Sequence, residues 1–275
     1  MHIAYLLLLW YHNYMTTPDS AHQTGEITGN IPKPHPNALL LPGVISVHEV
    51  LQRPTTEFPE FDGDLTRWNR DIAILTNALE HPRGFEYEAQ LPDIVGYMSP
   101  EEAAVIDSWG DVDASYSDDE GSDRLDDIRK QLPGLMQTIE KDLDLITAGQ
   151  GRFTFVEWEK YFTEAGKIGK GNGEFHVDEM VNKEEDVLTT HYFFANKEPT
   201  LYYRGPAKLF RLKSNGALKL DTDSLDHYKP GAVVAAPPYA IVRANGTTVH
   251  GSPSFKKSSS RAFMRATSGL ITPGE

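Results

Sequence analysis

The sequence predicts an α+β protein in which a helical first half packs against a C-terminal double β-sheet. Apolar residues recur at helical spacing before about residue 150, and short alternating runs follow from about Arg152. The 275 residues suffice for one sizeable core with a smaller helical annex. We therefore expect an extended N-terminal arm over residues 1–60, a helical region over 61–150 and a β domain over 151–275.

The arm contains two features of its own. The run from Ile3 to Tyr11 is apolar but too short to span a bilayer, so we expect a buried strand or a short helix there. The segment from Gly25 to Pro42 holds several prolines and is typical of an extended, irregular chain.

Three helices are expected in the second region. The first begins near Asp64, which can cap it, and stops at Pro82 and Gly84. Its apolar stripe consists of Leu65, Trp68, Ile72, Leu75 and Leu79. The second opens with the capping box of residues 99–102, which has proline at the first helical position. The third runs from about Leu125 to Leu143, and Pro133 should bend it or start it afresh.

Short strands are expected from residue 152 onward. Gly, Pro and the Asn-Gly pairs at 215–216 and 245–246 separate them, and such pairs suit tight hairpin turns. The expected strands are Arg152–Trp158, Leu188–Ala195, Thr200–Arg204, Leu209–Leu220, Ala232–Ala236, Ala240–Ala244, Thr247–His250 and Arg261–Thr267. Many short strands with little helix between them indicate a sandwich or barrel-like double sheet.

Charge and cysteine content narrow the function classes. The formal charge is −14, so nucleic acid and anionic membrane surfaces are poor partners. The segment from Asp107 to Asp127 is strongly acidic and should be a solvated loop. The chain has no cysteine, so any metal must be bound by His, Asp or Glu. The absence of cysteine does not tell whether the protein works in a reducing or an oxidising compartment. We expect a cytoplasmic location.

A possible metal site consists of His176, Asp178 and His250. His176 and Asp178 are two residues apart, so on an extended chain both side chains leave the same face. His250 lies on a later expected strand, which an antiparallel sheet can bring alongside. Two imidazoles and one carboxylate leave coordination positions open on Fe(II), as in non-haem oxygenases, although the same ligands also suit zinc and manganese.

An arginine on the last expected strand extends this pattern. Arg261 follows His250 after ten intervening residues and shares a face with Arg265 and Thr267. A guanidinium can bind a carboxylate through two parallel hydrogen bonds, so either Arg261 or Arg265 could anchor the distal carboxylate of 2-oxoglutarate. Tyr202 could hydrogen-bond the co-substrate or be a core aromatic residue. His191 is expected to be structural, and Gly166–Gly173 to be a mobile loop over the site.

The HxD pair, the distal histidine and the arginine after ten residues resemble the Fe(II)/2-oxoglutarate-dependent dioxygenase superfamily. More narrowly, the chain is similar to a bacterial family of unknown function with an F-H-x-D segment and a late H-R-S-P segment. The matching pieces, in roughly the last two-thirds of the chain, are residues 175–178, 200–205, 230–233 and 250–253, with LTRWNR at 65–70. Gly251 stands where that family has arginine.

The resemblance implies a double-stranded β-helix, also called a jelly-roll or cupin-like fold, as the core of the β domain. It implies that His176, Asp178 and His250 bind Fe(II) and that Arg261 holds 2-oxoglutarate. The implied reaction is hydroxylation, or desaturation, of a small organic substrate with O₂, releasing succinate and CO₂. In this superfamily halogenating members lack the carboxylate ligand, so Asp178 argues against halogenation.

Two other functions fit the same residues. A cupin-like metal enzyme that does not use 2-oxoglutarate would keep the three ligands and make Arg261 dispensable. A non-catalytic β-helix binding protein would have no working metal site. Demethylation of nucleic acid is disfavoured by the −14 charge. Neither the prime substrate nor the oligomeric state is apparent from the sequence.

Overall fold

The structure of the protein, a computed structural model, describes residues 58–81, 83–110, 112–117, 122–149, 151–168, 173–178, 190–212, 218–227 and 229–270. Nearly all of the expected N-terminal arm, including the apolar run from Ile3 to Tyr11, lies outside this part of the chain. Every described residue belongs to the unit Leu40–Glu275. Within the described ranges, no helix is long and apolar enough to cross a membrane.

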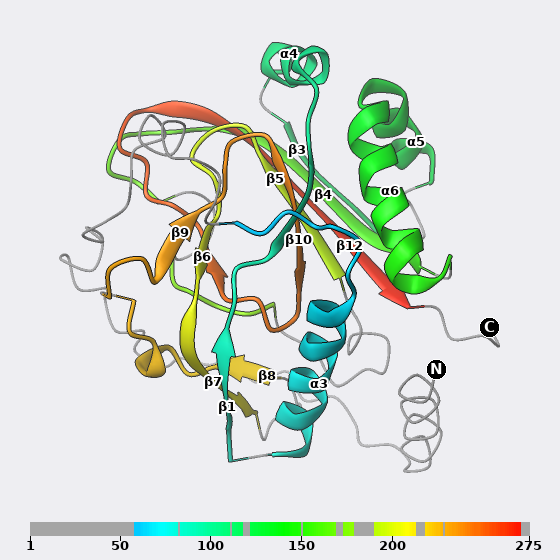
Figure 1. Ribbon diagram of the computed structural model, residues 1–275. Helices are drawn as coiled ribbons and strands as arrows, with labels where there is room; N and C mark the ends of the chain where they lie inside the picture. Colours follow the sequence, from blue (N-terminus) through cyan, green and yellow to red (C-terminus); the bar gives the residue numbers. More distant parts are fainter. Residues whose placement is uncertain are drawn as a thin grey trace, which may run out of the picture. The chain divides into compact units, whose positions relative to one another are not determined.

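Antiparallel sheets dominate the described structure (Figure 1). The largest is six-stranded, in the order β2 (Asp93–Tyr97), β10 (Ala240–Asn245), β5 (Thr190–Ala195), β12 (Ser259–Leu270), β4 (Gly151–Thr163) and β3 (Val112–Ser117). A second sheet contains β11 (His250–Gly251), β6 (Leu201–Tyr203) and β9 (Val233–Ala235). A third contains β1 (Phe85–Ala89), β7 (Gly205–Arg211) and β8 (Leu218–Leu220).

The order in which the chain visits the first two sheets defines the fold. After β4 in the six-stranded sheet, the chain reaches the second sheet at His176, which forms an antiparallel bridge with His250 of β11. It returns at β5, passes to β6 and β9, and then alternates through β10, β11 and β12. Phe193 of β5, Tyr202 of β6 and Val242 of β10 belong to one buried cluster between the two sheets. This is a jelly roll, so the predicted double-stranded β-helix core is confirmed.

The described helices follow the predicted starts and stops. The α-helices among them are α3 (Thr66–Glu80), α4 (Pro100–Ser108), α5 (Ser122–Gln131) and α6 (Pro133–Thr147), and a 3₁₀-helix, η3, spans Thr222–Ser224 in the β region. Ser99 caps α4 by accepting a hydrogen bond from the backbone N–H of Glu102 at 3.2 Å. Pro133 starts a new helix, which is one of the two outcomes that the sequence allowed. Glu102 in turn caps α6, because its Oε1 accepts hydrogen bonds from the backbone N–H groups of Gly134 and Leu135 at 2.6 and 3.1 Å.

The two faces of the six-stranded sheet differ in chemistry. On β12, Ala262, Met264 and Ala266 join the apolar cluster that the sheet forms with α4, α5 and α6. The alternate residues Arg261 and Arg265 point to the other face, as expected from the period of two. The helices therefore cover one face of the sheet, and the second sheet and the polar residues lie on the other. Figure 1 shows α6 beside this sheet, and α6 contacts β2 and β4.

Residues 61–150 are not purely helical, contrary to expectation. They also contain β1, β2 and β3, and the last two pair with β10 and β4 of the six-stranded sheet. Each is only five or six residues long, so its strand conformation depends on partners far away in the chain. The sheet therefore takes strands from both sides of residue 150, which does not separate a helical domain from a β domain.

Two other local expectations need correction. The acidic segment from Asp107 to Asp127 is not a loop throughout, because it contains β3 and most of α5. An edge strand such as β3 tolerates acidic residues, which discourage pairing with other chains. The Asn245-Gly246 pair does not close a hairpin, since it joins β10 to β11 in a different sheet. There Asn245 Oδ1 accepts hydrogen bonds from the N–H and the hydroxyl of Thr247, both at 2.8 Å.

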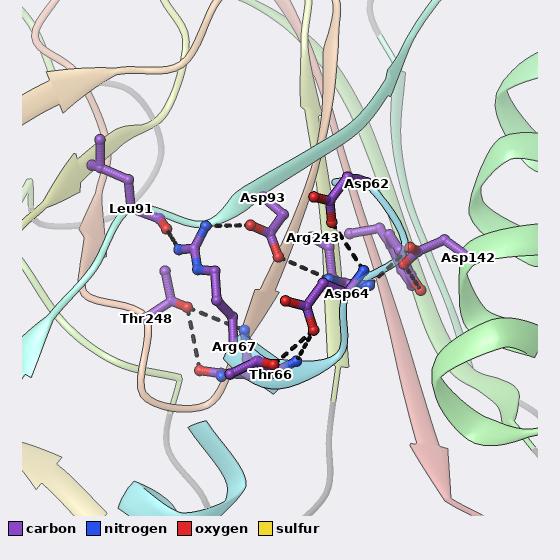
Figure 2. A network of polar contacts seen from close by, with 11 residues as sticks. Asp62, Asp64, Thr66, Arg67, Leu91, Asp93, Asp142, Arg243 and Thr248 are labelled. Atoms are coloured by element: carbon purple, nitrogen blue, oxygen red, sulfur yellow. Dashed lines mark hydrogen bonds and ion pairs between the residues drawn. The ribbon is translucent and has the colours of Figure 1, made fainter. Parts of the chain in front are cut away.

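A buried ionic network fastens α3 and α6 to the six-stranded sheet (Figure 2). Arg243 of β10 donates hydrogen bonds to Asp142 of α6 and to Asp93 of β2, each at 2.8 Å. Arg67 of α3 also forms an ion pair with Asp93. The second oxygen of Asp142 accepts a hydrogen bond from the hydroxyl of Tyr192 at 2.8 Å. The charges of Asp93, Asp142 and Arg243 are buried but paired, as buried charges must be.

Candidate metal centre

The backbone places the two predicted histidines directly opposite each other. His176 and His250 exchange both backbone hydrogen bonds, N–H to carbonyl, at 2.9 Å in each direction. Residues that pair in this way project their side chains from the same face of a sheet. The ring centroids are accordingly 4.5 Å apart. Although β11 is only two residues long, His250 is held on both sides, by His176 and by Tyr202 of β6.

Asp178 completes a cluster with the two imidazoles. It lies two residues beyond His176, so its side chain returns to the face on which the histidines lie. One ligand atom from each of His176, Asp178 and His250 lies within 4.8 Å of the others. His250 Nε2 is 3.9 Å from Asp178 Oδ1. The three side chains predicted from their spacing in the sequence therefore converge.

Both histidines present the same ring nitrogen to this cluster. His176 Nδ1 lies 3.0 Å from the carbonyl oxygen of Glu174, and His250 Nδ1 lies 3.0 Å from that of Thr248. A carbonyl oxygen can only accept, so each Nδ1 carries the hydrogen of the neutral ring. The lone pair is left on Nε2, which is the atom that a metal ion needs.

The electrostatics favour the protonation states that bind metal. Burial lowers the pKa of His250 to about 4, so its imidazole is neutral near pH 7. Burial also acts to raise the pKa of Asp178, but His191, His250 and Arg265 hold it below its usual range. Asp178 is therefore ionised. A neutral imidazole and a carboxylate are the forms in which these groups coordinate a cation.

Asp178 is held from two sides by side chains of other strands. Arg265 Nη1 of β12 donates a hydrogen bond to Oδ1 at 3.2 Å. His191 Nε2 of β5 lies 3.4 Å from Oδ2, and its Nδ1 lies 3.1 Å from the hydroxyl of Thr267. Burial lowers the pKa of His191. His191, expected to be merely structural, thus contacts the carboxylate directly.

His176 and His250 line a cavity of about 210 Å³. Its wall includes Phe193 and Thr200, three side chains of β4 (Glu157, Glu159 and Tyr161) and three of β12 (Arg261, Phe263 and Arg265). The β4 residues were missed in the sequence. Their alternation, E-W-E-K-Y, could have indicated that one face of this strand is polar, but which face lines a cavity depends on the sheet.

The candidate anchors for 2-oxoglutarate have different surroundings. Arg261 is 3% exposed and donates hydrogen bonds to the hydroxyls of Tyr161 and Thr200, at 3.0 and 3.2 Å. Arg265 instead forms ion pairs with Asp178 and Glu157. Arg261 therefore lines the cavity as a buried cation whose hydrogen bonds within the described ranges go to neutral groups.

Tyr202 is not among the residues that line the cavity. It is fully buried on β6, opposite His250, and its ring packs against those of His250 and Phe193. Burial raises the pKa of its hydroxyl. The structure thus places Tyr202 as a core aromatic residue in contact with one candidate metal ligand, His250. The middle of the expected mobile loop, residues 169–172, lies outside the described residues, so that expectation stays a prediction.

Comparison with known proteins adds structural likeness only. No family model and no curated protein matches the chain. The non-heme alpha ketoglutarate dependent epimerase SnoN from nogalamycin biosynthesis is 11% identical, with coverage of 73% of this chain and 83% of that chain and a TM-score of 0.35. EctD from S. alaskensis with 2-oxoglutarate and 5-hydroxyectoine is 12% identical, with coverages of 79% and 81% and a TM-score of 0.39.

A further similar structure is the viral collagen prolyl hydroxylase vCPH from Paramecium Bursaria Chlorella virus-1. It is 12% identical, with coverage of 70% of this chain and 99% of that chain and a TM-score of 0.30. With identities and TM-scores this low, these similarities carry no argument about activity. The strand order and the converging ligands of the chain itself define a jelly-roll protein with a candidate site for one metal ion.

Proposed function

We propose that this chain is a non-haem Fe(II)- and 2-oxoglutarate-dependent oxygenase that acts on a small organic substrate. The observation that carries the proposal is the convergence of His176, Asp178 and His250 beside a cavity that Arg261 also lines. Two imidazoles and one carboxylate with open positions are the ligand set of non-haem Fe(II) oxygenases.

The three side chains fit a divalent cation. Each histidine has its Nδ1 hydrogen directed to a backbone carbonyl, so both Nε2 lone pairs are available. Asp178 Oδ2 is buried and accepts no hydrogen bond from the described residues, although His191 Nε2 is 3.4 Å away. A buried carboxylate oxygen of this kind is costly unless a cation compensates it. The protein would thus supply two neutral ligands and one negative ligand.

Arg261 is the residue that we propose to bind the distal carboxylate of 2-oxoglutarate. Its guanidinium is buried in the cavity wall, and a buried cation bonded to hydroxyls gains most from a carboxylate partner. Arg265 already serves two carboxylates, Asp178 and Glu157, so it is the poorer candidate. Tyr161 and Thr200 would keep the Arg261 fork oriented toward the co-substrate.

When bound, iron and 2-oxoglutarate supply the oxidation, in which one oxygen atom of O₂ enters succinate, the other enters the substrate, and CO₂ is released. The residues of this chain hold and orient these groups and keep bulk water out, with Phe193 and Phe263 forming the apolar part of the wall. Hydroxylation is the outcome that we expect. A small-molecule substrate, a cytoplasmic location and membership of the narrower bacterial family belong to the same proposal. The net charge of −14 disfavours nucleic acid as the substrate.

The test is spectroscopic and uses the purified full chain without oxygen. Adding Fe(II) and 2-oxoglutarate together should produce a visible charge-transfer band. His176→Ala should abolish the band, whereas the control His81→Ala should retain it, because His81 is exposed at the end of α3. Arg261→Met should keep metal binding but require at least ~10-fold more 2-oxoglutarate to reach half of the band, given the loss of a charge-assisted pair.

Other results would favour other functions. A wild-type protein that binds Fe(II) but gives no band with 2-oxoglutarate would be better explained as a cupin-like metal enzyme. A protein that binds no divalent metal at all would be a non-catalytic β-helix protein. An unchanged band in the His176→Ala variant would contradict the assignment of His176 as a metal ligand.

A further inference from the structure

We infer that Arg265 and Glu157 form a positioning pair that orients the Asp178 carboxylate for the metal ion. The inference rests on the proposed function only in taking Asp178 as a metal ligand. In this inference Arg265 orients a metal ligand and does not bind 2-oxoglutarate. Glu157, which the sequence did not single out, holds Arg265.

The contacts form a chain of charged groups. Arg265 Nη1 donates to Asp178 Oδ1 at 3.2 Å, and Arg265 Nη2 lies 3.2 Å from Glu157 Oε2. The fork of the guanidinium thus bridges two carboxylates, and none of the three side chains is more than 30% exposed. A rigid planar fork transmits orientation, since a movement of one of its two nitrogen contacts moves the other.

Strand register explains why these residues meet. Arg265 of β12 is directly opposite Glu157 of β4 on one side and Phe193 of β5 on the other. Both neighbours line the same cavity, and the guanidinium reaches both Asp178 Oδ1 and Glu157 Oε2. His191 is opposite Thr267, two residues further along β12, and lies against the other carboxylate oxygen of Asp178. Asp178 lies outside the described strands, and these contacts orient its carboxylate.

The charges of this arrangement favour a cation. Arg265 alone would neutralise Asp178 and so weaken its attraction for a divalent metal ion. Glu157 offsets the arginine, so the three groups together retain one net negative charge beside the two imidazoles. The arginine therefore orients the ligand without removing the charge that metal binding uses, which is how residues around the ligands of a metal tune it.

The contrast with Arg261 makes the inference specific. The two arginines are four residues apart on the same face of β12, but Arg261 is opposite Tyr161, whereas Arg265 is opposite an acid. Arg261 is therefore available to a ligand carboxylate, and Arg265 is committed to a carboxylate of the protein. Substitution of the two residues should consequently impair different steps.

The experiment is a titration of the metal-free full chain with Co(II) alone, followed by its visible ligand-field absorption. Arg265→Met should raise the dissociation constant for Co(II) by at least ~10-fold and change the ligand-field spectrum, the loss typical of removing a partner of a metal ligand. Arg265→Lys, which keeps the charge but not the fork, should recover part of the affinity. The matched control Arg261→Met should bind Co(II) with wild-type affinity and spectrum.

Glu157 provides the second variant. Glu157→Gln should also weaken Co(II) binding, because the uncompensated arginine then competes with the metal for Asp178. If Glu157 acts through Arg265, adding Glu157→Gln to Arg265→Met should cause no further loss, so the two effects should be strongly non-additive. Simple additivity would show that the pair does not act as a unit.

The outcomes separate this inference from the proposed function. An Arg265→Met protein with wild-type Co(II) affinity and spectrum overturns the inference, and if it then fails to bind 2-oxoglutarate, Arg265 is the co-substrate anchor instead. A wild-type protein that binds Co(II) but never 2-oxoglutarate overturns the proposed function while the Arg265 effect on Co(II) still supports the pair. A wild-type protein that binds no Co(II) overturns both.

Discussion

Replacement of Arg243 by methionine tests the buried ionic network. The arginine donates one charge-assisted hydrogen bond to Asp93 and one to Asp142, each at 2.8 Å, and all three residues are buried. In the variant, Asp93 keeps its ion pair with Arg67, but Asp142 keeps only the hydroxyl of Tyr192. The variant leaves one buried carboxylate without a cation, so its free energy of unfolding should be lower than that of wild type by about 3–5 kcal/mol.

The pH dependence of this loss has a definite sign. Burial already raises the pKa of Asp142, and Arg243 acts in the opposite direction. Without the arginine, the folded-state pKa rises further above that of the unfolded chain. The folded variant then binds a proton more tightly than the unfolded one, so its stability should fall as the pH rises. The deficit relative to wild type should be larger at pH 7.5 than at pH 5.

Urea denaturation followed by tryptophan fluorescence measures the free energy of unfolding of each variant. Asp142→Asn in the Arg243→Met background should recover more than half of the loss, because the amide needs no cation and can still accept from Tyr192. Arg129→Met is the control: Arg129 also pairs with two acids, but at the exposed surface, so its loss should be below about 1 kcal/mol. If Arg243→Met also lost less than about 1 kcal/mol, the buried pairs would contribute no more than exposed ones and the reasoning would be refuted.

Two further variants probe other parts of the fold. Glu102→Ala should lower the free energy of unfolding by about 2 kcal/mol, because it removes the cap from the backbone N–H groups of Gly134 and Leu135. The control Glu101→Ala, at an exposed position, should change it little, and urea denaturation compares the two variants. Burial is the main cause that raises the pKa of Asp71 to about 6, so wild type should lose stability as this carboxyl ionises. The free energy of unfolding of Asp71→Asn, relative to that of wild type, should therefore increase by about 2 kcal/mol between pH 4.5 and 7.5. A constant difference over that range would contradict the assigned pKa.

The relative position of the candidate ligands His176 and Asp178 could be predicted because it depends on a local rule. An HxD pair on an extended chain puts both side chains on one face, whatever the fold. The register that puts His250 opposite His176 is not local. An antiparallel sheet allows it, and the resemblance to the oxygenase superfamily implied that the two histidines share a site. The helix starts at Ser99 and Pro133 were local, since capping and the missing proline N–H act within one turn.

Long-range pairing is what the sequence did not disclose. Arg261 and Arg265 share a face, so their spacing alone left the co-substrate anchor open. Choosing between them requires knowing that Tyr161 is opposite the first and Glu157 opposite the second, and β4 and β12 are separated by about a hundred residues. The strands β2 and β3 were missed for the same reason, because neighbours distant in sequence make them strands.

The inner face of the six-stranded sheet shows why the site lies where it does. On β10 that face is apolar, with Ala240, Val242 and Ala244 in the buried cluster between the sheets. On β4, β5 and β12 the same face carries buried ionisable groups, among them Glu159, His191 and Arg261. Stability alone would favour apolar residues at all these positions, because burying a charge is costly even when it is paired. The change from apolar to ionisable residues across one continuous sheet therefore supports the proposal that binding and chemistry take place in this part of the jelly roll.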